Sequence, residues 1–150
     1  MMWKTHLAFG GLIGLLLIPI LKPSQPIIFF AIVLFASLLP DIDHPDSKLG
    51  RKVKIISKLF KHRGFFHSIF GVALFTLPFL YFKLDLIAIP LLIGYCSHLL
   101  GDLITLEGIM PFYPLRISVK GFMRVNSWTE TGIFVLLLIF IVFIVKSMWF

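Results

Sequence analysis

Five long runs without Asp, Glu, Lys or Arg dominate the chain and limit what it can fold into. They cover residues 5–21, 23–40, 64–82, 86–101 and 131–145. A helix needs about 20 mostly apolar residues to cross the hydrocarbon core of a bilayer, and about 17 are tolerated. The runs therefore predict an all-α, polytopic membrane helix bundle with about five spans, some of them short or re-entrant.

The composition supports the same conclusion. Hydrophobic residues make up 59% of the 150 residues and charged residues 14%, whereas a soluble domain has about 45–50% and about 25%. The mean hydropathy is +1.00. A soluble protein of this length could not bury so much apolar surface, so lipid must cover part of it. We expect a single integral-membrane domain over residues 1–150.

The basic residues predict the orientation. In a five-span bundle, eleven of the 14 Lys and Arg residues fall on the side of the N-terminus. Basic residues are enriched in cytoplasmic connections, so we expect the N-terminus inside and the C-terminus outside the cytoplasmic (inner) membrane. The eleven are Lys4, Lys48, Arg51, Lys52, Lys54, Lys58, Lys61, Arg63, Arg116, Lys120 and Arg124, against Lys22, Lys83 and Lys146 on the other side.

The titratable residues gather on that same side. All five histidines and six of the seven acidic residues fall there, whereas chance would scatter them over both faces. Ionisable groups in apolar segments are costly and are usually functional. This predicts a polar site at the cytoplasmic membrane face. Its residues are His6, Asp41, Asp43, His44, Asp46, His62, His67, His98, Asp102, Glu107 and Glu130, while Asp85 is on the other side.

The stretch LLPDIDHPDS at residues 38–47 places Asp41, Asp43 and His44 directly after an apolar run. The C-terminal end of a helix disfavours negative charge, so this turn needs cations close to it. Either a metal ion or the basic residues at positions 48, 51 and 52 would supply them. The motif alone leaves both interpretations open.

The stretch HLLGD places His98 and Asp102 four residues apart, on one face of a helix. Two such residues within an apolar segment are candidate metal ligands. A structural hydrogen bond between helices is the alternative for this pair.

The stretch HRGFFHS carries His62 and His67 on either side of Gly64. A break at the glycine would let both imidazoles point inward, although His62 could equally be a solvated interfacial residue. Arg63 supplies a planar fork that suits phosphate or carboxylate.

Together these residues offer imidazole and carboxylate ligands without thiolate. That set suits Zn²⁺ or Mn²⁺ best, with Fe²⁺ and Mg²⁺ also accommodated, and it is large enough for one or two ions. For catalysis we expect Asp43 or Asp102 as base and Arg63 to stabilise negative charge, with Glu107 and Glu130 in reserve. The candidate metal ligands are His6, Asp41, Asp43, His44, His62, His67, His98 and Asp102.

The motifs LPDIDHPDS, HRGFFHS and SHLLGDLIT resemble those of the YdjM/YbcI-like family of predicted membrane-bound, metal-dependent hydrolases. The resemblance covers residues 5–114. It implies a small helical membrane protein with His and Asp at the membrane face and with hydrolytic activity. The positions that match by motif are His6, Asp41, Asp43, His44, His62, Arg63, His67, His98, Asp102 and Thr105.

Metal-dependent hydrolysis is the function that these features favour. The basic face favours a phosphoester, and the position at the membrane surface favours a lipid head group or another phosphorylated small molecule. A structural or sensory metal site without catalysis is the alternative. A metal or proton transporter is third, because transporter sites lie near the bilayer midplane, often between internal repeats.

The connections predict contact with lipid. SKLGRKVKIISKLFKHR, residues 47–63, has apolar residues at helical spacing with basic residues between them, as in an amphipathic helix on anionic lipid of the inner leaflet. Lipid accounts for this charge, so we expect no specific nucleic-acid partner, and the oligomeric state stays open. RISVKGFMRV, residues 116–125, predicts a short hairpin that turns near Lys120 and Gly121.

Overall fold

The computed structural model describes residues 1–45, 47, 50–53, 55, 59 and 62–149. In these residues the chain forms five α-helices, two short 3₁₀ turns and no strand beyond isolated bridges. This confirms the predicted all-α class. The elements are α1 (Trp3–Leu21), α2 (Pro26–Ala36), η1 (Leu39–Asp43), η2 (Phe65–His67), α4 (Ile69–Tyr81), α5 (Asp85–Leu103) and α6 (Trp128–Trp149).

Four helical segments in the described part of the chain are long and apolar enough to cross a membrane. They are Trp3–Leu21, Pro26–Asp43, Asp85–Leu103 and Trp128–Ser147. The third expected span, residues 64–82, forms a helix of only 13 residues, because residues 65–67 turn as η2 before α4 begins. At 1.5 Å per residue, α4 is about 20 Å long and does not reach across a hydrocarbon core of about 30 Å.

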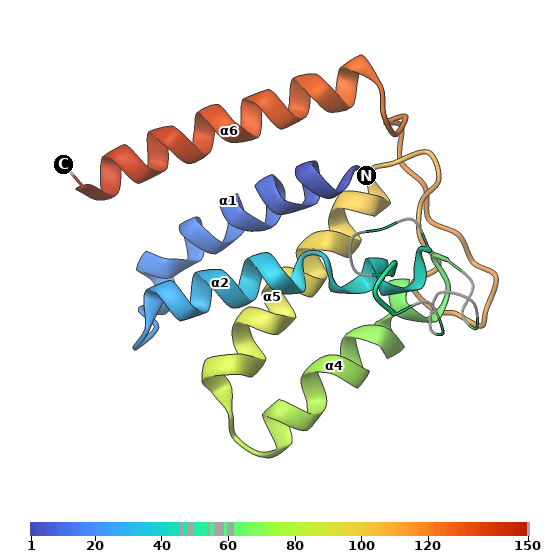
Figure 1. Cartoon of the computed structure of the whole chain (residues 1–150), viewed down its shortest axis with the longest axis horizontal. Coiled ribbons are helices and arrows are strands. Elements are labelled where there is room, and N and C mark those ends of the chain that lie inside the picture. Colours follow the sequence, from blue (N-terminus) through green and yellow to red (C-terminus); the bar gives the residue numbers. More distant parts are fainter. Residues whose placement is uncertain (46, 48–49, 54, 56–58, 60–61, 150) are drawn as a thin grey trace.

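Every α-helix has one end at the same end of the molecule. Figure 1 shows the first residues of α1, α4 and α6 there, together with the last residues of α2 and α5. The long connections also lie at this end. The sequence predicts that the titratable residues of the polar site share one membrane level. The helices place those that the structure describes at one end of the bundle.

The helix α5 is at the centre of the packing, since it contacts α1, α2 and α4. A side chain at Gly94 has no room: an added Cβ would lie 2.3 Å from the Val33 carbonyl oxygen and 2.6 Å from the Ala36 Cβ. Small residues allow such close approach of helices in membranes. The approach of α5 to α2 aligns the ends of these two helices, from which part of the polar site is built.

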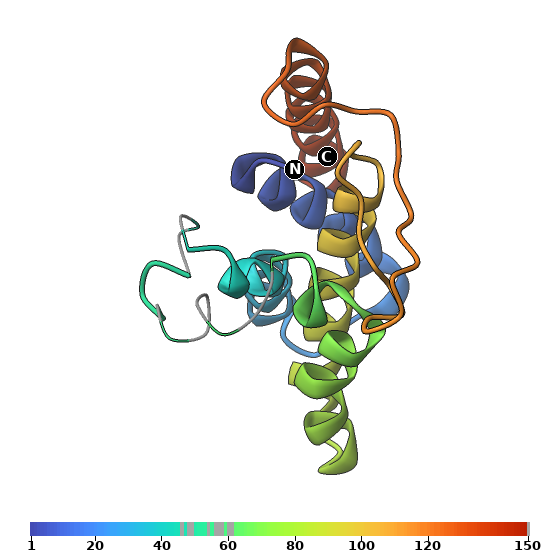
Figure 2. The same cartoon turned by 90° about the vertical axis from the view of Figure 1, so that its right-hand side faces the viewer.

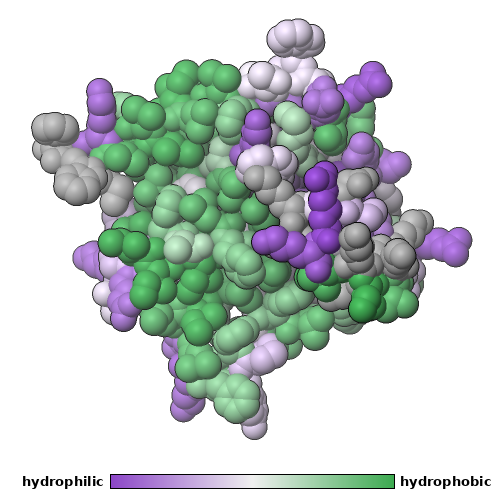
Figure 3. All heavy atoms as spheres, in the orientation of Figure 1, coloured by the Kyte–Doolittle hydropathy of each residue, from purple (hydrophilic) through white to green (hydrophobic). Residues whose placement is uncertain are grey.

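Large apolar side chains remain exposed on the outer faces of the helices. Examples are Ile20 at 71%, Tyr81 at 82% and Phe143 at 68% exposure. The helix α6 packs on α1, yet only 6% of the residues in its apolar segment are buried. Figure 3 shows a broad hydrophobic face over the helices, with hydrophilic side chains toward its edges. Exposed apolar patches of this extent indicate contact with lipid.

The connection between α5 and α6 differs from the predicted hairpin. Residues 119–123 pair with residues 104–109 after α5, through the Val119–Ile109 and Met123–Thr105 bridges, rather than with residues 116–118. Gly121 fits directly against the Ile104 carbonyl, with 2.1 Å from an added Cβ to that oxygen. Figure 2 shows this connection and the described residues that directly follow η1 on either side of the short segment before α4. Eight of the 17 residues of the expected amphipathic helix at 47–63 lie outside the described residues.

Candidate metal centre

Four nitrogen and oxygen atoms from three elements surround one point at the polar end of the bundle. Nε2 of His67 and Nε2 of His98 are 3.3 Å apart. The Asp102 Oδ2 atom is 3.4 Å from the first and 3.7 Å from the second. The Asp41 Oδ1 atom is 3.8 and 3.7 Å from the same two nitrogens.

These separations match the spacing of ligands around one metal ion. When a tetrahedral ion has ligands at about 2.1 Å, neighbouring ligand atoms are about 3.4 Å apart. The five distances above lie between 3.3 and 3.8 Å. The set of two imidazoles and two carboxylates suits Zn²⁺ or Mn²⁺, so the residues present fit such an ion.

Hydrogen bonds on the far side of each ring turn the Nε2 lone pairs inward. His98 donates through Nδ1 to the Ser37 carbonyl oxygen at 2.8 Å, and His67 donates through Nδ1 to Asp43 Oδ2 at 3.1 Å. Metal-binding histidines commonly have such a partner on the second nitrogen, which fixes the tautomer. Two facing lone pairs repel each other unless a cation lies between them.

The Asp102 carboxylate shows the same need for a cation. The residue is 1% exposed, and its Oδ2 atom has no hydrogen-bond partner among the described residues. A buried carboxylate oxygen without a partner carries a large desolvation penalty. It points at the His67 and His98 nitrogens, where a metal ion would remove that penalty.

The environment of His67 also favours positive charge. His67 lies in η2, outside the four candidate spans, and is fully buried. Burial lowers the pKa of its imidazole, but the neighbouring Asp102 and Asp43 carboxylates outweigh it and raise the pKa from 6.5 to about 9. Without a metal a proton supplies the charge, and metal binding would release that proton.

His6 joins the cluster from α1. Its ring stacks on that of His98, with centroids 3.7 Å apart, and its Nε2 is 3.3 Å from Asp102 Oδ1. Both ring nitrogens are buried without a hydrogen-bond partner among the described residues. His6, His98 and Asp102 form a buried group with one ligand atom each within 4.8 Å of the others.

A second group of possible ligands adjoins the first. Asp41, His62 and His67 also offer one atom each within 4.8 Å of the others. His62 faces Asp43 Oδ1 through Nδ1 at 2.8 Å, and the His44 ring lies edge-on to His62 at 4.4 Å between centroids. The structure thus brings His44 beside the cluster but not into either group.

Asp43, expected as a ligand or a base, is turned toward ring nitrogens instead. One oxygen meets His62, and the other meets His67 and the Arg63 backbone N–H at 3.2 Å. Asp43 is 0% exposed. In this arrangement Asp43 holds two imidazoles in place rather than contacting the point between the Nε2 atoms.

A polar cavity of about 270 Å³ opens beside these groups. Its lining includes Asp41, His62, Arg63 and Glu107. The Arg63 guanidinium reaches Asp102 Oδ1 at 3.4 Å and Glu107 Oε2 at 2.8 Å. Ligand atoms, a basic fork and open space are therefore adjacent.

Comparisons with known proteins agree with this architecture. A sequence model described as YdjM inner membrane protein matches residues 1–150. The chain belongs to the YdjM family. Uncharacterized protein YvsG of Bacillus subtilis is 33% identical over 134 residues, covering 85% of this chain and 83% of that protein. Inner membrane protein YdjM of Escherichia coli is 42% identical over 90 residues, covering 53% of this chain and 45% of that protein. No solved structure matches the chain.

Membership in the YdjM family confirms the resemblance drawn from the motifs, and with the apolar helices it identifies a membrane protein. Thr105, which the resemblance included, accepts a hydrogen bond from Arg63 at 3.3 Å and so supports the arginine.

Glu130, held in reserve as a catalytic group, is fully buried. Its two oxygens accept the N–H groups of Met2 at 2.6 Å and Asn126 at 2.7 Å. It therefore joins the first residues of α1 to the start of α6.

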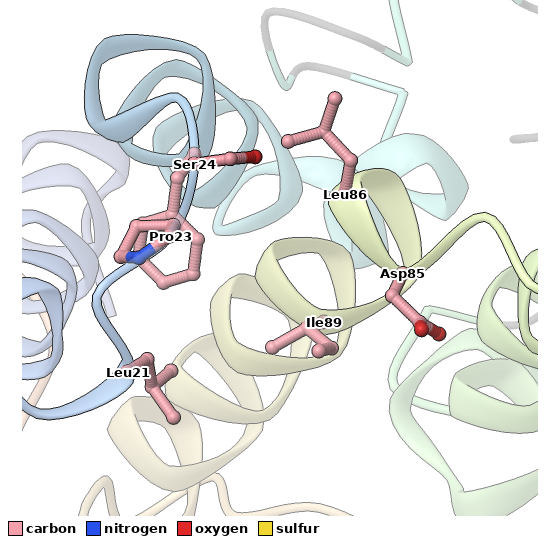
Figure 4. Close-up of a pocket in the computed structure, with 7 residues that line it drawn as sticks. Leu21, Pro23, Ser24, Asp85, Leu86 and Ile89 are labelled. Carbon is pink, nitrogen blue, oxygen red and sulfur yellow. The ribbon is translucent and has the colours of Figure 1, made fainter.

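Two contacts of this YdjM-family site involve backbone groups, so the spacing of residue types in the sequence could not predict them. The Ser37 carbonyl that orients His98 is a backbone group, which any residue would supply. The Met1 ammonium contacts Asp102 Oδ1. Asp85, in contrast, lies where expected, at the opposite end of the bundle, beside a separate cavity of about 210 Å³ (Figure 4).

Proposed function

We propose that this YdjM-family protein is a membrane-embedded, metal-dependent hydrolase that acts at the cytoplasmic membrane face on a phosphoester, such as a lipid head group. The main support is the polar cavity of about 270 Å³ beside the candidate ligands. Structural metal sites are closed by protein ligands, whereas catalytic sites keep a position open for water or substrate. A cavity lined by Asp41 and His62 would give water and substrate access to the metal.

The four atoms that surround one point would hold a single ion. His67, His98, Asp41 and Asp102 supply nitrogen and oxygen atoms at ligand spacing, and His6 adds a further imidazole. A bound divalent ion, Zn²⁺ or Mn²⁺ in our proposal, lowers the pKa of its water toward neutrality and polarises the scissile group. Where two ions bind, His6, His98 and Asp102 would hold one, and Asp41, His62 and His67 would hold the other.

His62 and Asp43 would move the proton when a single ion is bound. The Nδ1–H group of His62 donates to Asp43 Oδ1 at 2.8 Å, which leaves Nε2 as a proton acceptor. The His62 side chain is 32% exposed and lines the cavity. An imidazole oriented by a buried carboxylate is an effective general base, because the carboxylate fixes its tautomer and stabilises the imidazolium. This revises the expectation that Asp43 itself is the base.

Arg63 would stabilise the negative charge of the substrate and of the transition state. Its side chain lines the cavity and is only 13% exposed, so solvent screens it less than a surface arginine. A planar, permanently charged fork matches the oxygens of a phosphate. This supports a phosphoester over an uncharged ester as the substrate.

The cytoplasmic location rests on charge and on the relatives. Basic residues are concentrated in the connections at the end of the molecule that holds the site, and such connections are cytoplasmic in most membrane proteins. The Escherichia coli and Shigella flexneri relatives are named inner membrane proteins. Anionic lipid of the inner leaflet would face the same basic connections.

A structural or sensory metal site without catalysis is the second candidate. The burial of His6, His67 and His98 favours it, because buried ligands exchange slowly with solvent and these three join three elements of the bundle. A metal or proton transporter ranks third, since the ionisable groups lie at one end of the helices.

Hydrolysis assays on Asp102→Asn separate these candidates. Detergent-purified protein would be offered phosphomonoesters and phospholipids with Zn²⁺, Mn²⁺ or Mg²⁺ added back. We expect turnover by the wild type and by Asp85→Asn, which removes one charge at the opposite end, and no turnover by folded Asp102→Asn. A variant that loses metal and also unfolds would support the structural candidate. Full turnover without metal would rule out the proposal.

A further inference from the structure

The two terminal nitrogens of the Arg63 guanidinium have different kinds of partner. Its NH1 atom donates to the Gly108 carbonyl oxygen at 3.1 Å and to Thr105 Oγ1 at 3.3 Å. Neither acceptor carries a formal charge, so these two bonds fix the guanidinium without neutralising it. Thr105 Oγ1 is itself fixed by a hydrogen bond to the Asp102 carbonyl oxygen at 2.7 Å.

The backbone at Arg63 indicates that its position is strongly specified. Arg63 has φ 61°, in the left-handed region. This conformation is unfavourable for a residue with a side chain, and it persists only where the surroundings compensate. The contacts of NH1 and the Arg63 N–H bond to Asp43 Oδ2 at 3.2 Å supply that compensation.

The second nitrogen, NH2, faces two carboxylates of different kinds. Asp102 Oδ1 lies 3.4 Å away and belongs to the buried centre, whereas Glu107 Oε2 lies 2.8 Å away on a side chain that is 59% exposed. Glu107 also lines the polar cavity. The closest anion to the Arg63 guanidinium is thus an exposed carboxylate that lines the cavity.

We propose that Glu107 occupies the place of the substrate's anionic group on Arg63, and that a phosphate or phosphoester binds by displacing it. This inference rests on the proposed function, because it names the anion subsite of the same centre. The NH1 contacts would hold the guanidinium still while the Glu107 carboxylate turns out toward solvent. An anion in its place would lie on the arginine that contacts Asp102, beside the candidate metal.

The size and charge of the site fit this exchange. The cavity of about 270 Å³ is far larger than one carboxylate, since a water molecule takes up about 30 Å³ of liquid. A phosphate carries more oxygens and more negative charge than a carboxylate, whereas Glu107 presents one Oε2 contact within ion-pair distance of NH2. A ligand must therefore bind Arg63 more strongly than Glu107 does, and a weakly charged ligand would not displace the Glu107 carboxylate.

The test uses inorganic phosphate as the probe. Isothermal titration calorimetry would compare the detergent-purified full chain with Glu107→Gln, and metal content would be measured in each sample. We expect Glu107→Gln to bind phosphate about three- to tenfold more tightly, because the competing ion pair and the repulsion of the phosphate are both removed. Metal content should not change, since Glu107 contacts neither ligand group.

Two matched variants complete the test. Asp85→Asn removes the same charge at the opposite end of the bundle and should leave the phosphate affinity unchanged. Arg63→Gln combined with Glu107→Gln should lose the gain. Unchanged or weaker binding by Glu107→Gln, a gain that survives without Arg63, or no phosphate binding by any variant would overturn the proposal. Those results leave the hydrolase proposal standing if the same samples still bind metal and turn over substrate.

Discussion

His67 and His98 direct their Nε2 atoms at each other across 3.3 Å, although one residue lies in η2 and the other near the end of α5. Each ring donates from its other nitrogen, to Asp43 and to the Ser37 carbonyl. In the neutral rings both Nε2 atoms are acceptors, in a buried space that also contains a carboxylate oxygen of Asp102. An arrangement of this kind is stable only with a cation, which is why metal binding is the property to test first.

Removal of one imidazole should reduce metal binding sharply. We expect His98→Ala to lower the affinity for Zn²⁺ by more than about 100-fold, since loss of an orienting partner alone costs about 10–100-fold. Elemental analysis of purified protein measures this directly. Asp85→Asn, at the far end of the bundle, should retain wild-type metal content. Equal metal in His98→Ala and wild type would show that the ion, if bound, lies elsewhere.

The role of Asp43 can be separated from that of a ligand. In Asp43→Asn the amide keeps the size of the carboxylate but no longer holds the Nδ1–H groups of both rings as a charged acceptor. We expect the affinity for Zn²⁺ to fall about 10–100-fold while the number of ions bound at saturation stays the same. A lower stoichiometry at saturating Zn²⁺ would instead identify Asp43 as a ligand.

The close approach of α5 to α2 gives a stability prediction. In Gly94→Ala the new methyl would lie 2.3 Å from the Val33 carbonyl oxygen, and overpacking of this kind costs about 1–3 kcal/mol. Thermal unfolding in detergent should show a lower midpoint. Gly132→Ala is the control, because an added Cβ there meets nothing within 4 Å and alanine favours a helix by about 1 kcal/mol. Equal destabilisation by both variants would contradict the packing described.

Sequence patterns predicted the helices and the end at which the titratable residues gather, because both follow from the length and spacing of apolar runs. They did not predict the direction of individual side chains. Asp43 was expected at the metal, yet its carboxylate faces ring nitrogens, since a short 3₁₀ turn rather than spacing sets its direction. The hairpin near Gly121 was wrong because Gly121 packs against Ile104, and that contact draws the strand-like segment onto residues 104–109.

Membrane sidedness gives the last prediction. The N-terminus, the described residues after η1 and the connection after α5 lie at one end of the molecule (Figure 1). In the sequence, eleven of the 14 basic residues belong to these three stretches. The positive-inside rule then makes all three cytoplasmic.

Single cysteines at Lys52, Arg116 and Asp85, all exposed positions, test this in a Cys96→Ser background, since Cys96 is the only native cysteine. A membrane-impermeant thiol reagent added to intact cells should label Asp85→Cys alone, and permeabilised cells should label all three. The helices α2 and α5 end at the same end of the molecule (Figure 1). Lys52→Cys, which follows α2 and η1, and Arg116→Cys, which follows α5, must therefore be labelled from the same side of the membrane. Labelling of these two from opposite sides would contradict the bundle itself. Labelling of both from outside would keep the bundle and reverse its orientation, which would place the candidate metal centre on the other face of the membrane.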